Sequence, residues 1–290
     1  MSRRSLAVAA VLVLAGASDA FAQNRYGYGT DRGQQQAQGP GGDGLAMRYR
    51  YWMATLDGDV ESEDTGVTAS ELGLDSTLGM DDKEMVNDIA LWLPNLPLLG
   101  KLHVEYWWAD FKGTSVINSD VGFSGRTFTA GSTLNSDMHW KVWSFMWEYT
   151  AQGPQLGSLA GFPGTSGITG QFGVRYIVAD TDISDGVNNA SAEMNAWVFP
   201  VIGTHASMNF GTFLSLNLQI SGMQLFGMSD LDGLHFDLQA WVAVHISSFH
   251  AGAGYRWFKL DVKDDSPKGT DELDLDLYVE GFFFEAGFRF

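Results

Sequence analysis

The sequence has no cysteine, few basic residues and no long apolar run after its first segment. Without cysteine there is neither a disulfide nor thiolate chemistry. The 17 Lys and Arg against 35 Asp and Glu give a net charge of −18. This argues against nucleic acid as a partner, because phosphate binding needs a basic surface. A membrane-spanning helix needs about 20 mostly apolar residues in a row. If the chain crosses a membrane, it must therefore do so as a closed β-barrel, since lipid cannot satisfy open strand edges.

The N-terminus has the pattern of a secretory signal peptide over residues 1–22. A positively charged start is followed by an apolar stretch and then by the small-residue cleavage site Ala20-Phe21-Ala22. Residues 23–44 are rich in Gly and Gln and predict a flexible periplasmic lead-in. We therefore expect the folded part of the chain at residues 45–290.

The last thirteen residues, 278–290, alternate between two kinds of side chain. Phe282, Phe284, Phe288 and Phe290 fall on one face, and charged residues and glycine fall on the other. A period of two indicates a strand. The same alternation recurs in segments long enough to cross a bilayer, which takes about 9–11 residues in a tilted strand.

We predict an all-β fold, an antiparallel up-and-down transmembrane β-barrel of about ten strands, with eight to twelve possible. The clearest strands are expected at 101–111, 140–150, 171–180, 213–221, 234–246 and 273–290, and weaker ones at 45–56, 84–93, 192–202 and 250–260. Long loops are expected at 57–83, 112–137, 151–167 and 261–272, and short ones at 94–100, 204–211 and 247–249. Long loops would lie outside the cell and short turns in the periplasm.

A soluble periplasmic β-sandwich binding protein would show the same alternation and is the competing fold. Aromatic residues near strand ends favour the barrel, as at Trp107, Trp108 and Trp143. The polar faces also mix small residues, amides and single charges, as a packed lumen would.

The closing strand, which ends the chain at Phe290, resembles the C-terminal signal of bacterial outer-membrane β-barrels. That resemblance implies a location in the cell outer membrane, with outer-membrane lipid and the barrel assembly machinery as partners, and Phe288 and Phe290 as the assembly signal. Other segments are similar to a family of small outer-membrane barrels of unassigned function. They are 72–75, 91–99, 254–261, 271–277 and 281–290. This family implies a barrel and no activity.

The inward faces of such a barrel are predicted to carry a mixed-sign network. Its members are Arg48, Arg50, Asp88, Glu105, Glu148, Arg175, Asp237, Arg256, Glu285 and Arg289. Buried charges must be paired, so the network is expected either to pack the lumen or to line a narrow polar pathway for small solutes. The lipid-facing set is predicted to include Leu214, Leu216, Leu218, Phe236, Leu238, Phe282 and Phe284.

Catalysis is the less favoured alternative, in the form of a barrel hydrolase acting on lipid A or peptides. His103 with Glu105, and His235 with Asp237, are spaced to be neighbours on one strand face. No G-x-S-x-G or other nucleophile motif accompanies them, so we expect no enzyme. We also expect no cofactor and no metal, because the acidic loop residues at 57–64 and 261–276 lack EF-hand spacing.

Overall fold

The structure is a computed structural model that describes residues 44–63, 70–80, 83–94, 100–159, 162–193, 196–228, 231–264 and 272–290. The strands are β1 (Ala46–Glu63), β2 (Leu72–Gly73), β3 (Glu84–Trp92), β4 (Lys101–Val116), β5 (Val121–Phe123), β6 (Arg126–Phe128), β7 (Thr133–Leu159), β8 (Phe162–Ser184), β9 (Asn189–Glu193), β10 (Trp197–Phe210), β11 (Leu214–Met228), β12 (Leu231–Ile246), β13 (Phe249–Asp264) and β14 (Glu272–Arg289). The expected signal peptide and nearly all of the lead-in lie outside the described residues. A helix long and apolar enough to cross a membrane is not found in the described parts of the chain.

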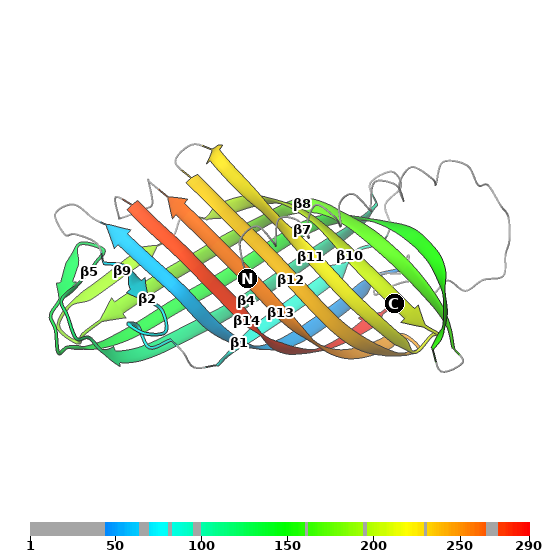
Figure 1. Ribbon diagram of the computed structural model, residues 1–290, viewed down its shortest axis with the longest axis horizontal. Coiled ribbons are helices and arrows are strands. Elements are labelled where there is room, and N and C mark those ends of the chain that lie inside the picture. The colour runs from blue at the N-terminus through cyan, green and yellow to red at the C-terminus, as the bar shows by residue number, and fades with distance from the viewer. Residues whose placement is uncertain are drawn as a thin grey trace.

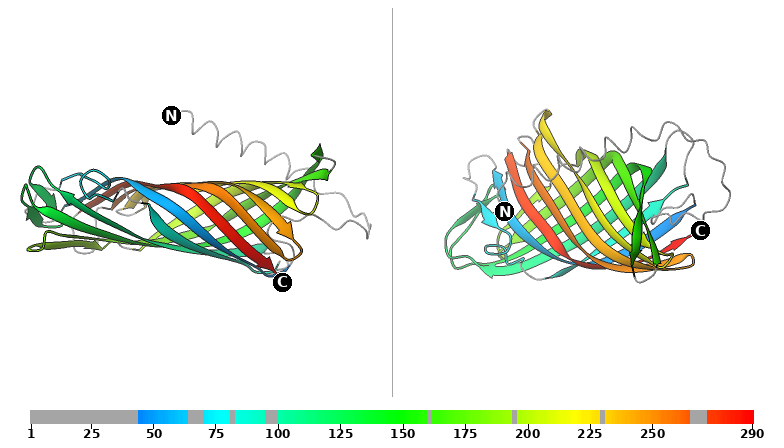
Figure 2. Two further views of the ribbon diagram at one scale, coloured as in Figure 1. Left: turned by 90° about the horizontal axis from the view of Figure 1, so that it is seen from below. Right: turned by 45° about the vertical axis from the view of Figure 1, so that its right-hand side comes forward.

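Ten of these strands close into a ring, as Figures 1 and 2 show. Its order is β1, β3, β4, β7, β8, β10, β11, β12, β13 and β14, and every pairing is antiparallel. The first and last strands pair along their whole length, from Ala46 opposite Arg289 to Glu63 opposite Glu272. The antiparallel up-and-down barrel is confirmed, and the sandwich, which needs two separate sheets, is wrong.

The two ends of the barrel differ in their connections. At the end where β14 finishes, β10 joins β11 and β12 joins β13 through tight turns. There Gly211 has φ of 60° and Ser247 has φ of 56°. We call this the turn end. The opposite end, which we call the loop end, carries β2, β9 and the β5–β6 hairpin and lies at the left in Figure 1.

Two predicted loops are strands. Residues 151–159 belong to β7 and residues 162–167 to β8, and the two strands stay paired as far as Leu159 opposite Phe162. A register shift between Gln152 and Gln155 accommodates Pro154. This proline lies beyond the part of β7 that pairs with β4. Proline is tolerated at bulges and free strand edges. Glycine and proline in this segment therefore mark an irregular hairpin instead of a loop.

The second misplaced loop, 204–211, forms the turn-end half of β10. Ser207 and Asn209 are buried inside the barrel and alternate with outward-facing Met208. The polar composition of this segment predicts a loop, but its polar residues are inward-facing positions of a strand. The predicted strand at 192–202 is correspondingly split between β9 and the start of β10.

Large apolar side chains cover the outside of the turn-end part of the ring. On β14, Phe282, Phe284 and Phe288 are exposed by 64%, 55% and 48%. The same band continues over other strands with Ile89, Phe145, Phe172, Val174, Val198, Ile202, Leu218, Val242 and Val244. Monomeric soluble proteins rarely expose a continuous apolar belt of this kind. We therefore treat this band as the part of the barrel that spans the membrane.

The other predicted lipid-facing residues also lie on the outer face. Leu218 is exposed by 43%, and Leu214, Leu216, Phe236 and Leu238 are half-buried between outward neighbours. Toward the loop end the band meets a row of aromatic rings. Tyr106 stacks on Trp143 at 4.1 Å, and Trp257 stacks on Tyr278 at 5.9 Å. Such rings are typical of the membrane–water interface.

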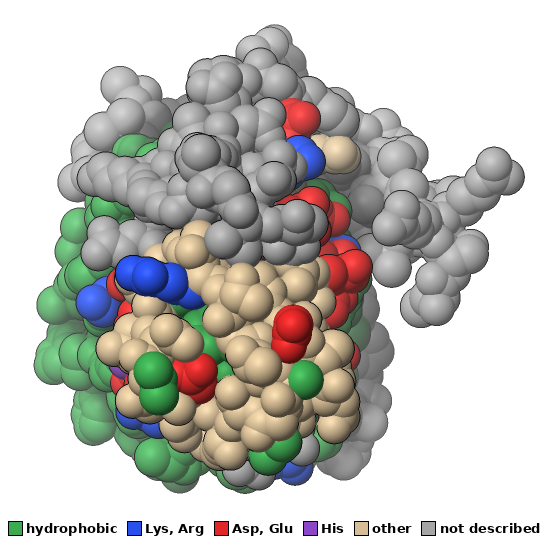
Figure 3. Space-filling view, turned by 90° about the vertical axis from the view of Figure 1, so that its left-hand side faces the viewer, with side chains coloured by type: hydrophobic (Ala, Val, Ile, Leu, Met, Phe, Trp, Pro, Cys, Tyr) green, Lys and Arg blue, Asp and Glu red, His purple; other side chains and the backbone are tan. Residues whose placement is uncertain are grey.

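Beyond that aromatic row the two faces of the strands exchange character. On β14 the inward side chains Leu273, Leu275 and Leu277 are buried, while Asp274 and Asp276 face outward. The apolar core they join also includes Leu56, Val60, Leu72, Phe111, Phe123, Phe128, Ile183, Leu260 and Val262. Figure 3, which looks at the loop end, shows mostly polar side chains and backbone over the described surface. The loop-end half is therefore built like a water-soluble barrel.

Candidate functional site

The centre of the barrel holds four arginines and four carboxylates. They are Arg48 and Arg50 on β1, Asp88 on β3, Glu105 on β4, Arg175 on β8, Asp237 on β12, Arg256 on β13 and Glu285 on β14. We call these eight residues the ion-pair cluster. Each is exposed by 5% or less, and with all groups ionised their charges cancel. A balanced set meets the requirement that buried charges be paired.

Arg256 joins three other members of the cluster. Its Nε donates to Asp237 Oδ1 at 3.1 Å and its Nη2 to Asp237 Oδ2 at 2.7 Å, which is a bidentate pair. Its Nη1 donates to Asp88 Oδ2 at 3.0 Å and lies 3.4 Å from Glu105 Oε1. Strands β3 and β4 are not neighbours of β13 in the ring. These bonds therefore cross the lumen.

The other three arginines extend the cluster around the wall. Arg175 donates to Asp237 Oδ2 at 3.1 Å and to Ser144 Oγ at 3.1 Å. On β1, Arg48 lies 3.1 Å from both Asp88 and Glu105. Its neighbour Arg50 bonds Glu285 at 2.8 Å and the amide oxygen of Gln239 at 2.7 Å. The two strands that close the barrel are thus tied to each other through Arg50 and Glu285.

Aromatic rings cover the cluster on the side of the loop end. The guanidinium of Arg256 lies 5.1 Å from the ring centre of Trp52 and 5.5 Å from that of Trp107, distances at which cation–π attraction operates. Trp107 meets Phe258 edge-on at 5.4 Å, and Trp140 meets the same Phe258 at 6.5 Å. Strands β7 and β13, which carry Trp140 and Phe258, are diametrically opposite in the ring. Side chains therefore touch across the full width of the lumen.

Two of the ten predicted network residues lie apart from the cluster. Glu148 forms a separate group with His103 Nδ1 at 3.2 Å and Gln171 Nε2 at 2.9 Å. The ring of His103 stacks on Trp92 at 4.3 Å. Arg289 lies half-buried at the rim of the turn end. The structure thus places eight predicted residues in one cluster and two closer to the turn end.

Sequence reasoning missed the neutral members of these groups. Gln239, Ser144 and Gln171 complete the hydrogen bonding of charged neighbours. All three occupy inward positions of strands that were predicted. The period-two pattern could have found them, because an inward polar residue beside a buried charge is a ready partner for it.

The two predicted histidine–carboxylate pairs do not form. His103 contacts Glu148, while Glu105 contacts Arg48 and Arg256. His235 Nε2 lies 3.3 Å from the carbonyl oxygen of Pro200, while Asp237 is bound by two arginines. Arginine outcompetes histidine for these buried carboxylates because it is always charged and binds through two nitrogens. Within the described ranges, no three His, Asp or Glu residues are grouped to hold a metal ion.

Neither a family model nor a curated protein matches the chain. Solved structures that do resemble it include Ail, the attachment invasion locus protein of Yersinia pestis, at 10% identity, with a TM-score of 0.30 over 86% of this chain and 99% of that one. The transport unit of the autotransporter AIDA-I from Escherichia coli has 10% identity and a TM-score of 0.40 over 94% and 97%. The Pseudomonas putida toluene transporter TodX has 8% identity and a TM-score of 0.24 over 86% and 91%. These neighbours are outer-membrane β-barrels, and likenesses this loose carry no argument about function.

Proposed function

We propose that this chain is an outer-membrane β-barrel with a closed lumen and a structural role in the envelope. The observation that carries the proposal is the ion-pair cluster together with the aromatic layer above it. Arg256 bonds carboxylates across the lumen, and Trp140 reaches Phe258 on the opposite wall. An ion would have to displace several buried charge pairs and then cross an apolar core. Both steps oppose conduction.

The proposed location is supported by the apolar belt and by the aromatic outer face of β14. Phe288 and Phe290 lie exposed at the end of β14, by 48% and 73%. An aromatic outer face of this kind supports insertion into the outer membrane, and the predicted signal peptide supports export. The use of Phe288 and Phe290 as a signal to the assembly machinery stays a prediction.

The test is conductance of the refolded protein in planar lipid bilayers. A gel comparing boiled and unboiled samples first establishes that the barrel is folded, because a folded barrel migrates differently until it is heated. We expect no stepwise current from the folded protein. A variant with Arg256, Trp140 and Phe258 all changed to Ala is the positive control, because it removes contacts across the lumen. Regular single-channel steps from the unaltered protein would contradict the closed lumen and support a narrow pore instead.

The proposal assigns no catalytic step to the chain. Its support is that Glu105 and Asp237 are bound by arginines and that His235 lies against a backbone carbonyl. Neither His103 nor His235 is then held by the carboxylate that the sequence suggested for it, whereas hydrolysis of lipid A or peptides requires a histidine held by a carboxylate beside a nucleophile. The preparation used for conductance should accordingly show no turnover of either substrate class.

A further inference from the structure

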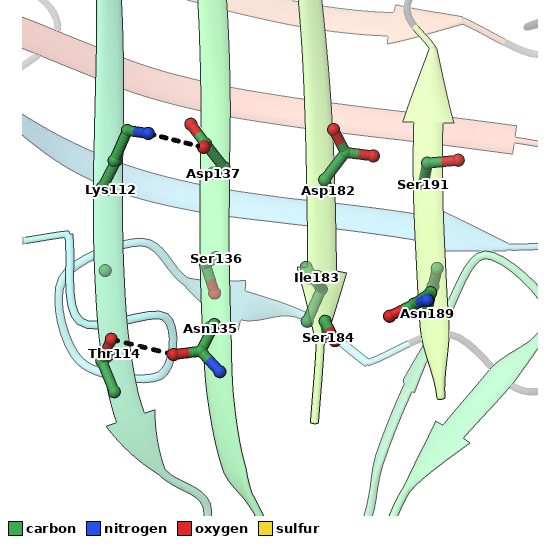
Figure 4. Close-up of a pocket in the computed structure, with 12 residues that line it drawn as sticks. Lys112, Thr114, Asn135, Ser136, Asp137, Asp182, Ile183, Ser184, Asn189 and Ser191 are labelled. Atoms are coloured by element: carbon green, nitrogen blue, oxygen red, sulfur yellow. Dashed lines mark hydrogen bonds and ion pairs between the residues drawn. The ribbon is translucent and has the colours of Figure 1, made fainter. Parts of the chain in front are cut away.

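The outer wall of the loop-end half contains a hollow of about 590 Å³. Four strands line it, β4, β7, β8 and β9, as Figure 4 shows. This volume is within the range of small-molecule sites, roughly 300–1,000 Å³. The hollow lies outside the lumen and away from the ion-pair cluster.

Its outward side chains form two rows that run across the sheet. One row is Lys112, Asp137, Asp182 and Ser191, and the next is Thr114, Asn135, Ser184 and Asn189. The four remaining lining residues, Gly113, Ser136, Ile183 and Ala190, alternate with these along the same strands. Their side-chain positions face the barrel interior, so their backbone forms the floor of the hollow. Every side chain that rises from this floor is polar.

Pairings within the rows leave hydrogen-bonding groups of both kinds available. Lys112 Nζ lies 3.0 Å from Asp137 Oδ2, and Thr114 Oγ1 donates to Asn135 Oδ1 at 3.2 Å. The amide nitrogen of Asn135 remains a donor, and the amide of Asn189 supplies both a donor and an acceptor. Asp182 is exposed and stands directly opposite Asp137 in the sheet register. Because Lys112 and His139 lie against Asp137, the carboxylate of Asp182 is the one placed to accept hydrogen bonds from a ligand.

We propose that this hollow binds a saccharide. A sugar hydroxyl donates one hydrogen bond and accepts others, which matches a surface of carboxylate, amide and hydroxyl groups set in fixed rows. An apolar ligand would find no apolar side chain above the floor. A bare metal ion would need a grouping of acidic side chains or histidines that the described residues do not form here.

The height of the hollow points to the carbohydrate layer at a membrane surface, a step that rests on the proposed outer-membrane location. Along β4, Lys112 is four residues beyond Trp108, an outward aromatic beside Tyr106 of the interfacial row. At about 3.4 Å per residue this places the hollow roughly 14 Å from Trp108 along the strand, toward the loop end. Sugars of membrane glycolipids and soluble glycans share the same hydroxyl chemistry. The experiment must therefore separate these two sources.

The test measures binding by the folded barrel in phospholipid nanodiscs and uses two probes. One is a panel of immobilised soluble oligosaccharides, and the other is intact lipopolysaccharide incorporated in the nanodisc. Asp182→Ala and Asn189→Ala should each weaken binding about tenfold or more, the scale of losing hydrogen bonds to a charged group or to a well-placed amide. Asp59→Ala is the matched control. It removes an exposed carboxylate from β1, outside the hollow, and should change affinity less than about twofold.

A loss confined to the lipopolysaccharide arm would identify membrane glycolipid as the ligand, and a loss confined to the panel would identify a soluble glycan. Either result supports the site. Absence of binding in both arms, or equal binding by Asp182→Ala and the unaltered protein, would overturn it. The conductance experiment does not involve these residues. The saccharide site and the closed lumen can therefore fail independently.

Discussion

The same strands build both halves of this barrel, but the chemistry of the inner and outer faces is exchanged between the two halves. In the turn-end half, β14 directs Phe282 and Phe284 outward and Glu285 inward, whereas in the loop-end half it directs Asp276 outward and Leu277 inward. The alternation is continuous through Gly281, and only the chemistry of the two faces changes. The polarity of each face of a strand therefore matches the medium that the face contacts. Apolar side chains face lipid where there is lipid, and they face the interior where the outside is water.

The largest expected effect comes from breaking the ion-pair cluster in the turn-end half. Arg256→Met leaves Asp237 without its bidentate partner, with Asp88 and Glu105 buried beside it. Removing one member of a buried pair costs about 3–5 kcal/mol. We expect a loss of that size in urea unfolding of the barrel in lipid vesicles.

The matched control for this change is Arg126→Met. Arg126 is exposed on β6 in the loop-end half, and replacing it should stay within about 0.5 kcal/mol. If the two variants were equally stable, the ion-pair cluster would not contribute to holding the barrel together.

A second substitution tests the exchange of faces directly. Phe284→Arg puts a charge on the apolar belt, which costs about 2–4 kcal/mol near the bilayer midplane. Asp274→Arg, on the same strand and the same outer face but in the loop-end half, should cost less than about 1 kcal/mol. The readout is again unfolding in lipid vesicles. Equal effects at the two positions would mean that the boundary of the membrane does not lie between them.

The same exchange explains which parts of the fold the sequence predicted. The ring, its strand number and the inward arginines follow from period-two alternation in segments such as 101–111. The strands were predicted too short at the loop end. Asp57, Asp59 and Glu61 indicate a loop by composition, yet β1 continues to Glu63 with Val60 buried inside. A strand prediction that requires an apolar outer face ends where the two faces exchange. Beyond that point the outward-facing residues of the same strand are acidic.

Which side chains pair within the lumen depends on distances between different strands. The sequence of one strand does not give those distances. Charge balance predicted a mixed-sign network without naming its pairs, and the structure includes Arg256 with Asp237 among them. It did not predict that arginines would bind Glu105 and Asp237 in place of the nearby histidines. That pairing depends on side chains that extend from β1, β8 and β13. The hollow on the outer wall was missed for a related reason. It depends on the register that sets Asp182 beside Asp137 and Ser191.

The smallest expected effect is a pH dependence of the loop-end half. On its outer face, the hydrogen bond that His139 Nδ1 makes with Asp110 Oδ1 at 2.6 Å raises the pKa of His139 above its ordinary value of 6.5. A histidine whose pKa is higher folded than unfolded stabilises the fold fully below the unfolded pKa, and this stability is lost as the pH rises through the folded pKa. The two side chains are exposed by 39% and 58%, so the contribution should be under about 1 kcal/mol. Proton NMR of the His139 ring should show the raised pKa, and Asp110→Asn should return it toward 6.5. A pKa that is unchanged in Asp110→Asn would show that the hydrogen bond does not set it. The pair would then contribute nothing to the difference between the halves.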